Sequence, residues 1–125
     1  MSMSSIQAAK ILVTESNYGL NKTQIFAMIF ICDYVFKKRY QKSLINQKFI
    51  PHAFLPYNQD LSDKIFGYGN NKVGNLFRSV DIDNVNNLEK DTIVECYHIY
   101  HKQPEYTLIS IVRNINRDIK YSSFC

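Results

Sequence analysis

Cys96, His98 and His101 stand close together in the sequence as a Cys-x-His-x-x-His string, and all three are metal-ligand residue types. On a helix, His98 and His101 are three residues apart, so both imidazoles could face one cation. A structural zinc ion takes four ligands, and the sequence has no Cys-x-x-Cys pair or second histidine pair to complete the set. We therefore predict partly exposed histidines on the side of a helix, with no metal ion and no cofactor.

Asp33 interrupts a run from Ile25 to Phe36 that is otherwise entirely apolar or aromatic. A carboxylate that is buried without a partner is costly, so the sequence allows two interpretations. Asp33 either faces outward and pairs with Lys37, four residues further along the same helix, or it is a buried polar site with a functional or network role.

Cys32 and His52 supply the residue types of a thiol nucleophile and its base. However, no glycine-framed turn surrounds the cysteine, and the spacing matches no thiol-enzyme family. Gly67 and Gly69 form a Gly-x-Gly that lacks the third glycine and the preceding parallel strand of a nucleotide-binding fingerprint. We therefore predict that the protein is not an enzyme.

Length and composition predict an ordinary globular domain. The chain has 125 residues, of which 46% are apolar and 21% charged, so we expect one domain over residues 1–125 and neither disorder nor a coiled-coil rod. The net charge of +4 is dispersed. The longest basic cluster, from Lys37 to Arg39, falls where positive charge complements the carbonyl end of a helix. Charge is therefore a weak indication of a nucleic-acid partner.

The cysteines and the apolar pattern bear on location. Cys32, Cys96 and Cys125 are odd in number and widely spaced, which is typical of reduced thiols in a cytosolic protein. The N-terminal residues do not resemble a signal peptide, and the run from Ile25 to Phe36 is shorter than the ~20 apolar residues that span a bilayer. We expect a cytoplasmic protein without a membrane partner; its oligomeric state is left open.

Helical periodicity and capping motifs predict a mainly α fold, a single compact helical domain around a central apolar helix at about residues 21–41. Because that helix is apolar on nearly all sides, other helices must cover it. The capping-box spacings of Ser4 with Gln7 and of Asn21 with Gln24 predict the starts of the first helix and of the central helix. The first helix should end near Asn17.

The middle of the chain has no helical period. Residues 44–57 carry paired apolar residues with breakers at Pro51 and Pro56, which predicts an extended segment or a short β-hairpin. Asn58 can cap a short helix from Gln59 to Phe66. Residues 70–87 are rich in asparagine and should form a loop with one or two helical turns.

Two helices joined by a tight turn are predicted at the C-terminal end. Asn86 with Glu89 marks the start of the first, which runs to about Lys102, and Pro104 suits the first turn of the second. The pattern of the first helix rests on Leu88, Thr92, Val94, Glu95 and Ile99. The last helix has apolar residues at Tyr106, Leu108, Ile109, Ile111, Val112 and Ile115, and polar ones at Arg113, Asn114, Asn116 and Arg117. Because this layout loosely matches a helix-turn-helix, a small nucleic-acid-binding regulator is the alternative function.

The order of these features resembles the Panacea antitoxin domain, a family that includes SocA-like antitoxins and many phage-associated proteins. Met28-Ile29-Phe30-Ile31-Cys32-Asp33 is similar to the L-L-Y-F-A-D end of the family's second helix, including the aspartate. Phe49, Ala53 and Tyr57 fall where the family places its F-x-A and the tyrosine of its Y-G-P motif. The stretch from Ile99 to Leu108 resembles the family's late turn, with Thr107 near its serine. Asn58-Gln59 replaces the family's Gly-Pro, and Ala27 replaces its lysine.

The resemblance implies a protein that acts by binding another protein, either a toxin that it holds inactive or a host factor that a phage-encoded inhibitor blocks. The sequence also has several aromatic residues in segments without helical periodicity. They are consistent with a protein-binding function, because aromatic residues are favoured at the centres of interfaces. The predicted partner-binding residues are Phe54, Tyr57, Tyr68 and Phe77.

Overall fold

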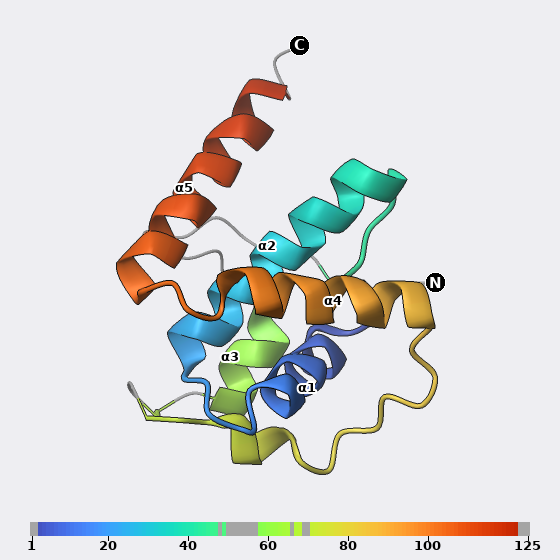
Figure 1. The fold of residues 1–125 in the computed structure, drawn as a ribbon, viewed down its shortest axis with the longest axis vertical. Helices are drawn as coiled ribbons and strands as arrows, with labels where there is room; N and C mark the ends of the chain where they lie inside the picture. Colours follow the sequence, from blue (N-terminus) through green and yellow to red (C-terminus); the bar gives the residue numbers. More distant parts are fainter. Residues whose placement is uncertain (1–2, 48, 50–57, 66, 69–70, 123–125) are drawn as a thin grey trace.

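The computed structural model describes residues 3–47, 49, 58–65, 67–68 and 71–122, with side chains up to residue 118. These residues form five α-helices and one 3-10 helix (Figure 1). The described part of the chain contains no strand, only isolated β-bridges between Met3 and Ile45 and between Asn21 and Lys72. The predicted mainly α fold is therefore confirmed. The elements in chain order are α1 (Ser5–Glu15), α2 (Lys22–Tyr40), α3 (Gln59–Ile65), η1 (Gly74–Phe77), α4 (Asn87–Tyr100) and α5 (Glu105–Ser122).

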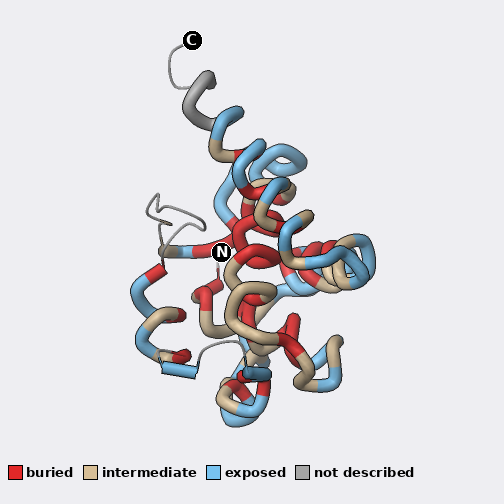
Figure 2. The backbone as a smooth tube through the Cα atoms, turned by 90° about the vertical axis from the view of Figure 1, so that its left-hand side faces the viewer, coloured by how far each residue is buried: buried red, intermediate tan, exposed pale blue. Residues whose placement is uncertain are grey.

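Helix α2 is the predicted central helix. It contacts α1, α4 and α5, and every residue from Ala27 to Asp33 is buried. Helix α1 shares the centre of the molecule, because it contacts α2, α3, η1 and α4. Figure 2 shows that the buried residues gather where these helices cross. The buried apolar side chains belong to one core cluster, so the elements are held by a common interior.

Local hydrogen bonds explain where three helices begin. At α1, Ser4 Oγ accepts from the Gln7 amide at 3.1 Å, and the Gln7 side chain accepts from the Ser4 amide at 3.1 Å. Asn21 and Gln24 form the same reciprocal pair at α2, with both distances 3.0 Å. These capping boxes satisfy amides that have no partner within the helix, and the two predicted starts are confirmed. Asn86 caps α4 by accepting from the Glu89 amide at 2.8 Å.

The described part of segment 44–57 is not a hairpin. The Met3 amide donates to the Leu44 carbonyl at 2.9 Å, and the Asn46 amide donates to the Met3 carbonyl at 2.8 Å. Leu44 and Ile45 are thus paired with the start of the chain in a single parallel bridge. Residues 48 and 50–57, where the rest of the expected hairpin or extended segment would lie, are outside the described residues.

The buried face of α4 follows the predicted periodic pattern only in part. The buried residues are Glu89, Thr92, Ile93 and Cys96. Of the residues in the predicted periodic pattern, Thr92 is buried, whereas Leu88 and Ile99 are 45% and 54% exposed. The tertiary contacts explain this, because α4 packs against both α1 and α2, and those contacts bury Ile93 and Cys96.

Helix α5 packs along α2 with Leu108, Val112 and Ile115 buried. It extends to Ser122. Among the described residues, no helix has the combined length and apolarity needed to cross a membrane.

Candidate functional site

Asp33 is buried, and its carboxylate is bound by backbone amides and a lysine of the same chain. Its Oδ1 accepts from the backbone amides of Leu44 at 3.0 Å and Ile45 at 3.2 Å, and its Oδ2 lies 3.2 Å from Lys37 Nζ. Because Leu44 and Ile45 also pair with Met3, the carboxylate joins α2 to two other segments of the chain. The pair with Lys37 is confirmed, and the outward orientation is wrong. The network that Asp33 joins holds the fold together.

Cys32 and Cys96 face each other between α2 and α4. Both are free thiols, buried to 0% and 2% exposure. Burial raises the pKa of Cys32 well above its usual value, while a hydrogen bond from Cys32 lowers the pKa of Cys96. Cys32 is therefore poorly suited to act as a nucleophile in this conformation. His52 and Cys125 lie outside the described residues.

His98 and His101 each have a separate partner. His98 Nε2 lies 3.5 Å from Glu15 Oε2 of α1, whereas His101 Nδ1 lies 3.0 Å from the Tyr97 carbonyl oxygen. The His101 ring also stacks on the ring of Tyr97, with 4.7 Å between centroids. Among the described residues, no group of three or more potential ligands could hold a metal ion. His98 is largely exposed and His101 partly exposed, as predicted for the side of a helix.

Of the four aromatic residues predicted to contact a partner, the structure describes Tyr68 and Phe77. Phe77 is completely buried in η1, with Lys64 Nζ 5.7 Å from its ring centroid, so the prediction for Phe77 is wrong. The 3-10 turn directs its side chain into the core. Tyr68 is 43% exposed, so its side chain is accessible to solvent. Phe54 and Tyr57 lie outside the described residues.

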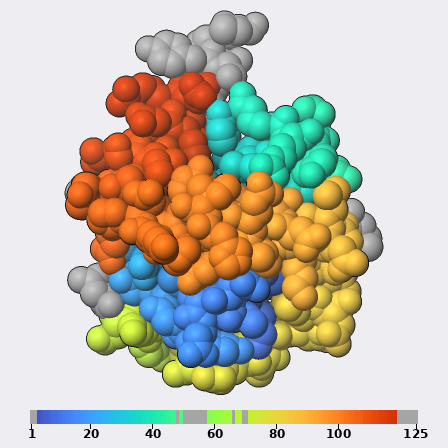
Figure 3. Space-filling view, in the orientation of Figure 1, coloured from blue at the N-terminus to red at the C-terminus, as the bar shows by residue number. Residues whose placement is uncertain are grey.

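Helix α4 and the start of α5 present large apolar side chains to solvent. Leu88 and Ile99 are about three helical turns apart, which places them on the same side of α4. Tyr106, in the first turn of α5, is 76% exposed. Figure 3 shows α4 and the first part of α5 lying across one face of the molecule. We call Leu88, Ile99 and Tyr106 the α4–α5 apolar surface.

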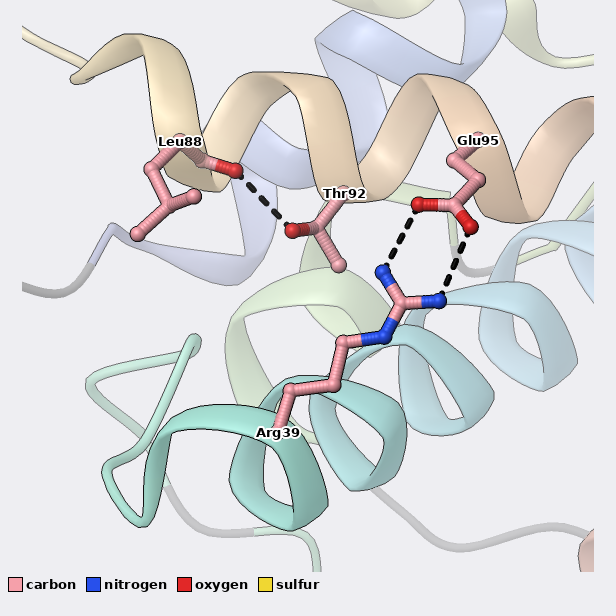
Figure 4. Close-up of polar contacts among 4 residues, drawn as sticks. All are labelled: Arg39, Leu88, Thr92 and Glu95. Carbon is pink, nitrogen blue, oxygen red and sulfur yellow. Dashed lines mark hydrogen bonds and ion pairs between the residues drawn. The ribbon is translucent and has the colours of Figure 1, made fainter.

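An ion pair lies on the side of α4 that carries Leu88 (Figure 4). Arg39, near the end of α2, makes two hydrogen bonds to Glu95 at 2.7 and 2.8 Å. The hydrogen bonds to Arg39 lower the pKa of Glu95, and the carboxylate raises the pKa of Arg39. The charges of Arg39 and Glu95 thus satisfy each other, and the surface around them can be covered without leaving either unpaired.

Glu89 is the one buried side chain of α4 with an unsatisfied oxygen among the described residues. Its Oε1 accepts from the side-chain amide of Asn86 at 2.5 Å, whereas Oε2 has no hydrogen-bond partner. Burial raises the pKa of Glu89, and the positive charge of Lys42 partly offsets that effect. Glu89 faces the interior, so it belongs to the packing of α4 rather than to its exposed side.

Comparisons with known proteins add no relative: neither a protein-family model, nor a curated protein, nor a solved structure matches the chain. The resemblance to the Panacea antitoxin domain therefore stays a prediction that rests on the sequence motifs.

Sequence reasoning missed the α4–α5 apolar surface because it used Leu88, Ile99 and Tyr106 only as pattern residues of their helices and did not ask which side of each helix faces solvent. One signal was present. Both Leu88 and Ile99 share their side of α4 with Glu95, a charged residue that favours solvent.

Proposed function

We propose that the protein acts by binding another protein through direct contact, in the manner of a toxin-neutralising antitoxin. A phage-encoded inhibitor of a host factor would use the same kind of contact. The proposal combines the resemblance stated above with the exposed apolar side chains of α4 and α5.

The observation that carries the proposal is the exposure of Leu88, Ile99 and Tyr106. Single exposed apolar residues are ordinary, but here two lie on one side of one helix and an exposed tyrosine lies at the start of the next helix. Tyrosine is also among the residues that dominate binding energy when an interface buries them. The paired charges of Arg39 and Glu95 suit a position within or beside such an interface.

A matched pair of tyrosine substitutions tests this proposal. Tyr106→Asp and Tyr68→Asp introduce the same charge at two exposed tyrosines, of which Tyr106 lies on the α4–α5 apolar surface. Tagged wild-type protein should retain a stoichiometric protein partner from a native lysate, with the product of the adjoining gene as the first candidate. We expect Tyr68→Asp to retain this partner and Tyr106→Asp to lose it, because an aspartate there would be buried without a counter-charge.

Two results would overturn the proposal. Loss of the partner in Tyr68→Asp alone would place the interface elsewhere, and recovery of no protein partner across salt concentrations would remove the function itself. In the second case, a mobility shift with nucleic acid that weakens steeply with salt would favour the regulator instead.

A further inference from the structure

Helix α1 ends in two consecutive residues with left-handed backbone conformation, Asn17 at φ 55° and Tyr18 at φ 62°. The Asn17 amide donates to the Thr14 carbonyl at 3.2 Å, and the Tyr18 amide donates to the Val13 carbonyl at 2.6 Å. This is the Schellman pattern, which requires one left-handed residue, here Asn17. The pattern does not require the second, and tyrosine rarely adopts this conformation. Tyr18 is therefore held in a strained position by its surroundings.

Gly74 of η1 is the first of these surroundings. A Cβ atom at position 74 would lie 2.6 Å from the Tyr18 carbonyl oxygen and 2.7 Å from its Cα. Because those atoms are backbone and cannot move aside, only glycine fits here. This close approach fixes Tyr18 against η1, which lies beside α1.

Two cations meet at the Tyr18 ring. The guanidinium carbon of Arg78 lies 3.9 Å from the ring centroid, and Lys10 Nζ lies 5.7 Å from it and 3.5 Å from the hydroxyl. Each cation is held by a neutral partner. Arg78 Nε donates to Asn75 Oδ1 at 2.7 Å, and Lys10 Nζ donates to the Arg78 carbonyl at 2.7 Å. The side chains are thus set in place before any ligand arrives.

Among the described residues, no carboxylate forms an ion pair with Lys10 or Arg78. Within the described part of the chain, the terminal guanidinium nitrogens of Arg78 make no hydrogen bond to protein.

The pKa of the Tyr18 hydroxyl is affected by the two cations. Its pKa is lowered first by a hydrogen bond with the Thr14 side chain and then by Lys10, with a smaller contribution from the charge of Arg78. The Thr14 hydroxyl is therefore a fourth polar group beside the two cations.

We propose that Lys10, Thr14, Tyr18 and Arg78 form a binding site for a phosphate group. The free edge of a guanidinium offers two parallel N–H donors, and a lysine adds a compact charge from another direction. A carboxylate has two oxygens, which the guanidinium alone would satisfy. A phosphate has further oxygens that can also accept from Lys10 Nζ and from the Tyr18 hydroxyl. The Thr14 hydroxyl lies beside them but donates its own proton to the Lys10 carbonyl at 2.7 Å. The site is formed by α1, the residues that follow it and the end of η1, and it does not depend on the proposed protein partner.

Titration of ¹⁵N-labelled protein with inorganic phosphate, at constant ionic strength, tests the site by amide chemical shifts. We expect saturable shifts centred on Tyr18, Gly74 and Arg78. Arg78→Gln and Lys10→Gln should each weaken binding about tenfold, as expected for a lost charge-assisted hydrogen bond. Lys90→Gln removes the same charge from the exposed side of α4 and should change the affinity less than about twofold.

Arg78→Lys keeps the positive charge but loses the two parallel N–H donors of the guanidinium, so it should bind phosphate with intermediate affinity. This variant gives a second test if Arg78→Gln does not fold. A single-stranded oligonucleotide that binds more tightly than a nucleoside monophosphate, and loses that advantage in Arg78→Gln, would assign the phosphate to a nucleic-acid backbone. Equal binding of both probes would assign it to a small molecule. Linear, unsaturable shifts, or equal weakening by Lys90→Gln and Arg78→Gln, would overturn the proposal.

Discussion

Helices α2 and α4 each contain residues that break the usual pattern of apolar side chains inside and polar side chains outside. The two helices differ in whether the fold provides partners for these residues. In α2 the exception is Asp33, a charge inside the core, and every oxygen of its carboxylate has a partner within the fold. In α4 the exceptions are Leu88 and Ile99, apolar side chains in solvent without a covering element. Asp33 is the more conspicuous exception in the sequence, and its role is to stabilise the fold. Leu88 and Ile99 are less conspicuous in the sequence, but they lie on a surface that a partner can reach.

Substitution of Asp33 should give the largest loss of stability. Asp33→Ala leaves the buried amides of Leu44 and Ile45 without an acceptor, so we expect the free energy of unfolding to fall by about 4 kcal/mol. Chemical denaturation monitored by circular dichroism measures this change.

Asp33→Asn is the control, because its amide oxygen can still accept from both backbone groups while the pair with Lys37 is lost. It should cost only about 1 kcal/mol. Equal losses in the two variants would mean that the charge, and not the hydrogen bonding, is what the fold requires.

Glu89 should give a smaller effect that depends on pH. Burial raises its pKa above the ordinary value of 4.5, so the folded state binds a proton more tightly than the unfolded state. Stability contributed by this group therefore rises as the pH falls from neutral towards 4.5, and it is lost as the pH rises through the folded-state pKa. Denaturation at several pH values measures the free energy of unfolding of the wild type and of Glu89→Gln, which carries no charge at this position. We expect Glu89→Gln to be the more stable protein at neutral pH, and the difference in free energy of unfolding to become smaller as the pH falls and the wild type gains stability. A difference that does not change with pH would contradict the burial of Glu89 with an unsatisfied oxygen.

The Arg39–Glu95 pair should give the smallest effect, although it links the two helices directly. Both side chains are largely exposed, so solvent screens their attraction. We expect Arg39→Ala and Glu95→Ala each to lower the melting temperature by no more than about 2 °C, and the double variant to lose little more. A much larger shift would show that the contact between α2 and α4 depends on this pair rather than on the buried side chains.

The parts of the fold that were predicted correctly are those encoded locally. Ser4 with Gln7 and Asn21 with Gln24 determine helix starts through contacts three residues apart, so the sequence alone indicates them. The inner face of α4 could not be read from local signals, because its packing against α1 and α2 decides that Glu89 is buried and Leu88 exposed.

The candidate sites were harder to predict for the same reason. The amides that satisfy Asp33 come from a loop without a local signature. Arg78 is distant in sequence from Lys10 and Tyr18, and it meets them only because η1 packs on the end of α1. The expected end of the first helix near Asn17 was all that the sequence indicated there.

The most direct test of the central claim measures stability and partner affinity in the same two variants, Ile99→Asp and Asp33→Asn. For Ile99→Asp we predict an unfolding free energy within about 0.5 kcal/mol of wild type and an affinity for the captured partner at least about tenfold weaker. For Asp33→Asn we predict lower stability and unchanged affinity of the folded protein. The opposite pattern, with binding lost in folded Asp33→Asn and retained in Ile99→Asp, would contradict the assignment of function to α4 and of structure to α2.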